Sequence, residues 1–389
     1  MRRYETAERL KGIKPSGIRR LFALAQGVPD VISLGVGEPD FTPPPHVLGA
    51  VKQALDEGKT HYTPTMGVPE LLEALAKKAK REYDLSYDPQ SEVLITAGGS
   101  EAIFLALMAV LSPGDEVLVP DPGFVCYEPD ALMAGGVPVS MPLLARNEFR
   151  LDANAVMSLV TDKSRVMILN SPNNPTGSVL SHDDLAGLAK LAVERDLTVI
   201  SDEVYEKITY DNAKHYCVAT FPRMRERTVV VNSFSKTYAM TGFRIGYAYG
   251  PKELIAPMML VHQYATACVN GPAQYGAIAA LEGPQGFVKN MVREFDRRRR
   301  LLHSRLNKIE GFRSLLPKGA FYAFPDIKHF KTPSEEFTER LFNEAKVVTV
   351  AGSAFGKLGE GYLRFSYATA YDQLNEALDR IEKVTKTFK

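Results

Sequence analysis

Short apolar runs alternate with helical patterns between about residues 90 and 250. The runs are rich in Val, Ile and Leu, and stretches of helical length separate most of them. Strands of this kind with helical crossovers predict an α/β fold, in which helices cover both faces of a mostly parallel sheet. Ligands bind such sheets outside the carboxyl ends of the strands, so the residues that end each run are the first candidates for a site. The five clearest runs are EVLITAGG (92–99), DEVLVPDPG (115–123), SRVMILN (164–170), LTVISDEVY (197–205) and TVVVNSFSK (228–236).

The pattern changes after Gly283. Residues 287–311 predict one long amphipathic helix, and we expect its four consecutive arginines, 297–300, on a solvated face, where charge runs on helices usually lie. The remainder, which ends in a predicted helix at 372–386, indicates a smaller α+β part. Residues 27–45 are too rich in Gly and Pro for a regular element and are expected to form an ordered loop that lines a site.

The charge of the chain is balanced, with 47 Lys and Arg against 46 Asp and Glu and a net charge of +1. No broad field would therefore attract nucleic acid or anionic lipid. Cys126, Cys217 and Cys268 include no CxxC pair, which argues against a disulfide framework and a cysteine zinc site. The first residues lack the apolar core of a signal peptide, and the apolar runs are too short to span a bilayer. We expect a soluble cytoplasmic protein without a metal, and without nucleic acid or membrane as a partner.

Two of the strand ends offer backbone groups. Gly98 and Gly99 end the first run, and the helix expected from about Ser100 would direct unpaired amides at an anion, as in a phosphate-binding turn. A simple tight turn is the alternative. The segment is neither GxGxxG nor a P-loop, which counts against a dinucleotide or a nucleoside triphosphate. SPNNPTG (171–177) follows another run, and by itself it predicts a rigid turn.

Two other strand ends carry charge. Asp202 and Glu203 end a buried run, and because buried carboxylates are costly without a cation, we expect one of them to have a cationic partner. Lys236 ends the last run, and Ser233 and Arg244 are close to it in the sequence. A desolvated lysine at such a place can have a lowered pKa and act as an amine nucleophile, usually by forming a Schiff base.

Together, the motifs SPNNPTG, SDEVY and SFSKTYAMTGFRIGY resemble the class I aminotransferases, the aspartate aminotransferase superfamily of pyridoxal phosphate enzymes. The resemblance extends over nearly the whole chain and is closest to archaeal aromatic or broad-specificity members. It implies fold type I, with a large cofactor-binding domain (46–285) built on a mostly parallel seven-stranded sheet between helices. It also implies a small α+β domain formed by residues 1–45 and 286–389.

The resemblance implies a catalytic role for three residues. Lys236 would form the Schiff base with the aldehyde of pyridoxal 5'-phosphate and would later move the proton between the amino acid α-carbon and the cofactor. Asp202 would keep the pyridine nitrogen protonated, so that the ring accepts electrons. Tyr205, with Asn174, would hydrogen-bond the phenolic oxygen of the cofactor.

The cofactor phosphate would have its own set of residues by the same resemblance. Gly99 and Ser100 would offer backbone amides, Ser233 a hydroxyl and Arg244 a charge-assisted contact. Tyr62 resembles the tyrosine that reaches this phosphate from the neighbouring subunit. A homodimer with shared active sites is therefore implied.

The remaining predicted contacts concern the pyridine ring and the substrate. Phe124 occupies the place where family members stack an aromatic ring on the pyridine. Arg364 resembles the arginine that binds the substrate α-carboxylate in a bidentate pair, and Gly37 would add a backbone amide to that carboxylate. Asn174 would also border the substrate.

The sequence says less about the amino acid. Phe124, Tyr264 and Ile18 could supply apolar walls that suit an aromatic side chain. Glu101, directly after the phosphate turn, would repel a second substrate carboxylate, and Lys14 is a candidate to accept one. We therefore expect a ping-pong aminotransferase that moves the amino group of an aromatic L-amino acid to 2-oxoglutarate.

Three alternatives stay open at this point. Aspartate, alanine or a broad range of amino acids could be the donor. A C–S lyase could use nearly the same lysine, aspartate and arginine. A nucleotide-binding dehydrogenase would share the α/β sheet, but the GxGxxG motif that it needs is missing.

Overall fold

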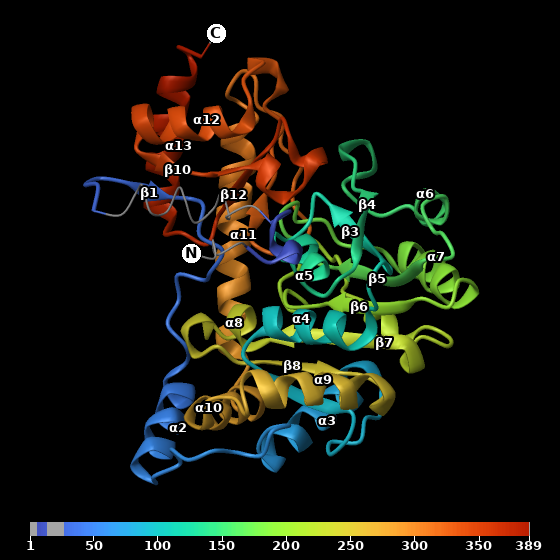
Figure 1. Cartoon of the computed structure of the whole chain (residues 1–389). Coiled ribbons are helices and arrows are strands. Elements are labelled where there is room, and N and C mark those ends of the chain that lie inside the picture. The colour runs from blue at the N-terminus through green and yellow to red at the C-terminus, as the bar shows by residue number, and fades with distance from the viewer. Residues whose placement is uncertain (1–5, 14–26, 389) are drawn as a thin grey trace, which may run out of the picture.

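The computed structural model describes residues 6–13 and 27–388, and the structural statements below concern those residues. Figure 1 shows a larger body of helices around a central sheet and a smaller body that contains the C-terminus. The long helix α11 (Gly286–Leu306) begins beside the larger body and ends in the smaller one. In the described part of the chain no helix is long and apolar enough to cross a membrane.

A seven-stranded sheet forms the centre of the larger body, as the sequence predicted. Strand β8 runs antiparallel to its neighbours β2 and β7, and the other pairings are parallel. The five predicted runs form β2, β3, β5, β6 and β7, whereas β4 and β8 were not recognised as separate runs. The order across the sheet is β2 (Val93–Thr96), β8 (Gly246–Tyr249), β7 (Thr228–Ser233), β6 (Thr198–Asp202), β5 (Ser164–Asn170), β3 (Glu116–Asp121) and β4 (Val137–Pro142).

Helices cover both faces of this sheet, which explains why its strands are apolar throughout. Successive strand residues face opposite sides: Val166 and Ile168 of β5 pack in one cluster with α4, α5 and α9, whereas Met167 and Leu169 pack in another with α7. Helices α2, α3 and α10 pack on the β2–β8 end. The helices are α2 (Pro45–Asp56), α3 (Pro69–Tyr83), α4 (Gly99–Val110), α5 (Tyr127–Met133), α6 (Ala153–Met157), α7 (His182–Glu194), α8 (Phe234–Thr237), α9 (Lys252–Ala265) and α10 (Gly271–Glu282).

The smaller body contains short strands and the last helices. A three-stranded antiparallel sheet has the order β11 (Val350–Ala351), β12 (Leu363–Ser366) and β9 (Tyr322–Ala323). Helices α12 (Ser334–Arg340) and α13 (Tyr371–Thr385) pack near it, and α13 agrees with the predicted final helix.

The Gly/Pro-rich segment 27–45 was expected to contain no regular element, and this is wrong for three residues, the two of strand β1 (Ile32–Ser33) and Pro45, which begins α2. Strand β1 pairs in parallel with β10 (Val347–Val348). Ile32 and Leu34 are buried in the core of the smaller body, and their burial holds the segment against β10. The rest of the segment is loop up to α2.

The prediction that all four arginines of α11 lie on a solvated face is also wrong. Arg298 and Arg299 are buried. Arg299 pairs with Asp211 at 2.6 Å and with Asp296, and it donates to the carbonyl of Pro317 at 2.6 Å. These acceptors compensate the buried charge, and most of them are distant in the sequence.

Candidate active site

The carboxyl ends of the central strands bring the predicted residues to one edge of the sheet. Asn170 at the end of β5 is in register with Asp202 at the end of β6. Ser233, at the end of β7, is opposite Gly246, and Gly246 is in turn opposite Thr96 at the end of β2. Because α4 begins three residues after Thr96, its N-terminus lies beside the end of β7.

Lys236 lies on α8, whose N-cap is Ser233. Its Nζ donates a hydrogen bond to the carbonyl oxygen of Gly37 at 2.5 Å, so the Gly/Pro-rich segment does reach this edge of the sheet. Burial, followed by the charges of Arg364 and Arg244, lowers the pKa of Lys236 to about 8. An amine with this pKa is neutral in a much larger fraction near pH 7 than an ordinary lysine, which suits a nucleophile.

Asp202 is buried without a cation. Tyr127 donates its hydroxyl proton to Oδ2 at 2.6 Å, and the backbone amide of Val204 donates to Oδ1 at 3.3 Å. Burial raises the pKa of Asp202 to about 6, against the effect of the Tyr127 hydrogen bond. No Lys, Arg or His among residues 6–13 and 27–388 forms an ion pair with it, so a cationic group of a ligand would be stabilised here.

Phe124 lies near this carboxylate through Tyr127. The two rings pack edge to face, with centroids 5.6 Å apart and an angle of 75°. Tyr127 is a site residue that the sequence reasoning missed. It stands three residues after Phe124 at the start of α5, and nothing local to that stretch indicates its partner on β6.

Arg364 on β12 is buried, and its guanidinium donates hydrogen bonds to two acceptors. Nη1 donates to Oδ1 of Asn174 at 3.0 Å, and Nη2 donates to the carbonyl of Gly35 at 2.6 Å. Its Nε is buried without a hydrogen-bond partner in the described chain. The guanidinium lies 4.5 Å from the ring centroid of Tyr322 and 4.8 Å from that of Phe355. An orphaned donor in this setting is available to an anionic ligand.

Tyr205 follows β6, and its hydroxyl lies 2.9 Å from the hydroxyl of Tyr322 on β9. Burial raises the pKa of Tyr205 well above its usual value, so the phenol is neutral. Gly37 approaches the same place: a Cβ built on it would lie 2.6 Å from the Tyr322 oxygen, so only glycine fits without a shift. Tyr322 was also missed, since GAFYAFPDI reads as an ordinary strand.

The N-terminus of α4 has the features of an anion site. Its N-cap, Gly98, has φ 91° and no side-chain cap. Arg244 donates to the carbonyl of Ala97 at 3.3 Å, and a Cβ on Gly98 would lie 2.5 Å from its guanidinium. The absence of a side chain thus lets the guanidinium approach the free amides of Gly99 and the exposed Ser100.

Ser233, predicted to offer its hydroxyl to the same anion, lies at this edge. Its hydroxyl is within 2.9 Å of the Ser235 hydroxyl and within 3.1 Å of the Ile245 carbonyl, and it caps α8 by accepting from the Ser235 amide. Its single proton is therefore shared with groups of the protein.

Two predicted contacts, Tyr62 and Tyr264, do not join the site within one chain, since they are 90% and 84% exposed. Two others, Lys14 and Ile18, lie outside the described residues.

Glu101 was expected to repel a second substrate carboxylate. Its side chain instead accepts hydrogen bonds from His262 at 3.0 Å, from Thr266 at 2.8 Å and from the amide of Ala97. Burial alone would raise the pKa of Glu101, but these hydrogen bonds bring it below its usual value. The carboxylate is thus held as an anion against α9.

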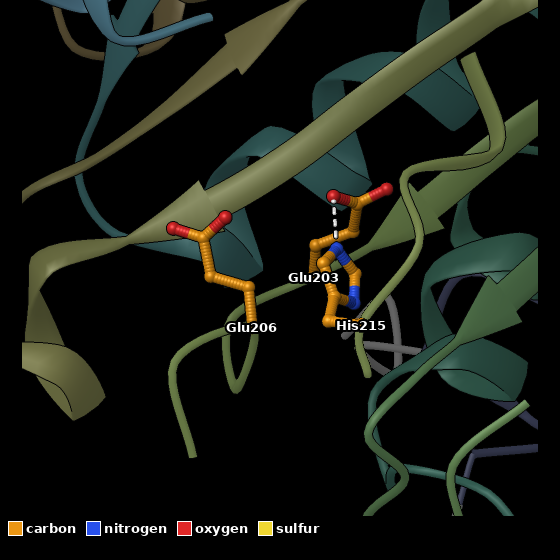
Figure 2. Close-up of side chains that lie close together, drawn as sticks. All are labelled: Glu203, Glu206 and His215. Atoms are coloured by element: carbon orange, nitrogen blue, oxygen red, sulfur yellow. Dashed lines mark hydrogen bonds and ion pairs between the residues drawn. The ribbon is translucent and has the colours of Figure 1, made fainter. Parts of the chain in front are cut away.

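One of the two strand-end carboxylates, Asp202 or Glu203, was expected to have a cationic partner, and the structure gives Glu203 such a partner in His215. His215 Nε2 lies 2.9 Å from Glu203 Oε2, and Glu206 lies close to both, as Figure 2 shows. Such a trio could ligate a metal ion, but Glu206 already pairs with the ammonium of Lys78 at 2.7 Å and accepts from Tyr83. The cluster is therefore a buried ion-pair network under the segment that carries Asp202.

The chain is similar to known proteins over nearly its whole length. Residues 29–381 match the family model described as aminotransferase class I and II. The chain is 49% identical over 385 residues to an aspartate aminotransferase of Pyrococcus abyssi (strain GE5 / Orsay), covering 98% of this chain and 99% of the relative. It is 48% identical over 385 residues to aromatic-amino-acid aminotransferase 2 of Thermococcus litoralis, with the same coverage. The solved aromatic aminotransferase from Pyrococcus horikoshii OT3 has a TM-score of 0.90 at 47% identity, covering 95% of this chain and 99% of that chain.

Proposed function

This chain belongs to the aminotransferase class I and II family, and we propose that within it the chain prefers aromatic L-amino acids as donors and 2-oxoglutarate as acceptor. The aminotransferase activity, the cofactor pyridoxal phosphate and the fold type I architecture are as the sequence predicted. The donor is the proposed part, because relatives of nearly equal similarity are named for aspartate and for aromatic amino acids.

The residues present fit pyridoxal phosphate. A buried carboxylate without a protein cation, Asp202, suits the protonated ring nitrogen, and the uncapped α4 with Arg244 suits the phosphate. The amine of Lys236, with its lowered pKa, suits the aldehyde. When bound, pyridoxal phosphate supplies an electron sink for bond breaking at the α-carbon of the amino acid.

In the proposed mechanism Lys236 Nζ takes up the α-proton of the amino acid and gives it up again as the amino group is transferred. Asp202 would accept a hydrogen bond from the protonated ring nitrogen, and Tyr127 orients that carboxylate. Tyr205 and Asn174 would donate hydrogen bonds to the phenolic oxygen, and Phe124 would lie against the ring.

Arg364 binds the α-carboxylate of every substrate in the proposed mechanism. Its unpaired Nε is one available donor, and Nη2, which lies on the same side of the guanidinium and donates one of its two N–H groups to Gly35, is the second. A fork of two charge-assisted hydrogen bonds fixes the α-carbon relative to Lys236. The backbone amide of Gly37 adds a third donor, and the segment that carries Gly37 then excludes water from the reacting atoms.

One observation carries the preference for an aromatic donor. The cations with the strongest effect on Lys236 are Arg364 and Arg244, and both already have a proposed anion, the α-carboxylate and the phosphate. Rings of Tyr322 and Phe355 flank Arg364. Aromatic rings beside the group proposed to bind the α-carboxylate favour an aromatic side chain over that of aspartate.

A homodimer with shared sites is part of the proposal. Tyr62 and Tyr264 are almost fully exposed in one chain, although large aromatic side chains are normally at least partly covered. A second copy that covers them would bring Tyr62 to the neighbouring phosphate site. The cytoplasmic location stays a prediction from the sequence, as does the division into domains at residues 46–285.

The test is a panel of amino donors with 2-oxoglutarate, ranked by kcat/KM. We expect phenylalanine, tyrosine or tryptophan to rank first, with glutamate and the donor's keto acid formed in equal amounts. If aspartate ranks first, the aspartate alternative is correct. Release of ammonia or a thiol in place of the keto acid would indicate lyase activity.

A further inference from the structure

Binding of the cofactor would decide which hydroxyl donates in the hydrogen bond between Tyr205 and Tyr322. Each tyrosine hydroxyl has a single proton to donate. If Tyr205 donates its proton to the phenolic oxygen of the cofactor, it can only accept at the 2.9 Å contact with Tyr322. Tyr322 must then be the donor to Tyr205. This argument rests on the proposed role of Tyr205.

We propose that Tyr322 is a positioning residue that donates its hydroxyl proton to the Tyr205 oxygen and so orients the Tyr205 hydroxyl toward the cofactor. A phenol that accepts a hydrogen bond is also the stronger donor, because hydrogen bonds in a chain polarise one another. The chain Tyr322, Tyr205, phenolic oxygen therefore stabilises the anionic form of that oxygen more than Tyr205 does alone.

Packing around Tyr322 restricts the position of its hydroxyl. The side chain is fully buried, and its ring lies in contact with Phe321 and Tyr205. Gly37 approaches its hydroxyl so closely that a Cβ there would lie 2.6 Å from the oxygen. Packing from both sides thus fixes the hydroxyl at Tyr205.

The ring of Tyr322 serves a second purpose. The guanidinium of Arg364 lies over it at 4.5 Å, within the range of a cation–π interaction. The hydroxyl therefore acts on the cofactor side of the site, while the ring acts on the group proposed to bind the α-carboxylate. Tyr322→Phe removes the first effect and keeps the second, whereas Tyr322→Leu removes both.

The experiment is a pH titration of the visible absorption band of the holoenzyme. Tyr205→Phe is expected to raise the pH midpoint of the band, because the phenolic oxygen loses a donor. Tyr322→Phe should raise it by roughly 0.3 to 1 pH unit, the size of one hydrogen bond. In the Tyr205→Phe background, Tyr322→Phe should add nothing, since its effect passes through Tyr205.

Steady-state kinetics separates the ring from the hydroxyl. Tyr322→Phe should leave KM for the donor within about threefold, whereas Tyr322→Leu should raise it roughly tenfold. Tyr367→Phe is the matched control: Tyr367 is equally buried, and its hydroxyl donates to the Ala320 carbonyl at 3.1 Å. It should leave the midpoint unchanged.

The outcomes are distinguishable. If Tyr205→Phe shifts the midpoint and Tyr322→Phe does not, the inference about Tyr322 is wrong and the proposed function stands. The inference is also wrong if the two shifts add in the double variant or if Tyr367→Phe gives the same shift. If Tyr205→Phe itself has no effect, the proposed role of Tyr205 fails, and the inference fails with it.

Discussion

Replacing Lys236 with methionine should stabilise the cofactor-free protein at neutral pH. The substitution keeps the length of the side chain but removes an amine whose pKa is lowered from 10.5 to about 8, chiefly by burial. At about 1.4 kcal/mol per unit, protonated Lys236 costs the folded state about 3 kcal/mol. Methionine also leaves the Gly37 carbonyl without its donor, which costs about 1 kcal/mol. The net gain in unfolding free energy at pH 7 is about 2 kcal/mol.

The gain depends on pH in a defined direction. Below pH 8 the lysine is protonated in both states, and the penalty is fully present. Between pH 8 and 10.5 only the unfolded state binds the proton, so the stability of the natural protein rises with pH toward that of the variant. Above 10.5 the penalty is gone, and Lys236→Met should be less stable by about 1 kcal/mol.

Urea denaturation of the cofactor-free proteins between pH 7 and 10.5 measures this difference. Protein concentration must be equal, because a dimer would make stability depend on it. Lys190→Met is the control for the loss of a lysine elsewhere on the molecule, since Lys190 is an exposed lysine of α7. A constant difference between natural protein and Lys236→Met over this range would refute the reasoning.

Three further predictions concern other parts of the molecule. Arg364→Lys should raise KM roughly 10- to 100-fold for every donor, because lysine cannot form the fork; steady-state kinetics tests this, and an effect on one class of side chain only would contradict it. Glu206→Gln should lower the free energy of unfolding by about 3 kcal/mol in urea denaturation, because buried Lys78 loses its most buried partner and keeps only Glu82; a loss below 1 kcal/mol would contradict it. Tyr62→Ala should weaken cofactor binding. In a hybrid dimer with a Lys236→Ala subunit, one of the two sites would have both natural residues, so cofactor binding should recover at half of the sites of such dimers; no recovery would exclude shared sites.

The residues that lie at strand ends could be predicted from the sequence because their position depends on local pattern. Asp202 and Lys236 both end apolar runs, and parallel pairing brings such ends to one edge. Tyr127 and Tyr322 could not be predicted in this way. Tyr322 meets Tyr205 across 117 residues, and that contact depends on how two separate sheets pack. The burial of Arg299 depends likewise on distant acceptors.

The same distinction explains why the sequence identifies the cofactor better than the donor. The groups proposed to hold the cofactor come mostly from one sheet edge, whose register is fixed by backbone pairing. Arg364 comes from a different sheet, but its hydrogen bonds to Asn174 and Gly35 fix it against that edge. Residues of one chain are thus sufficient to fix the proposed positions of the α-carboxylate and the α-carbon of any donor. In the proposed homodimer a second copy would cover the exposed Tyr264, which is a predicted wall for the donor side chain, and no pattern within one chain specifies how that copy docks.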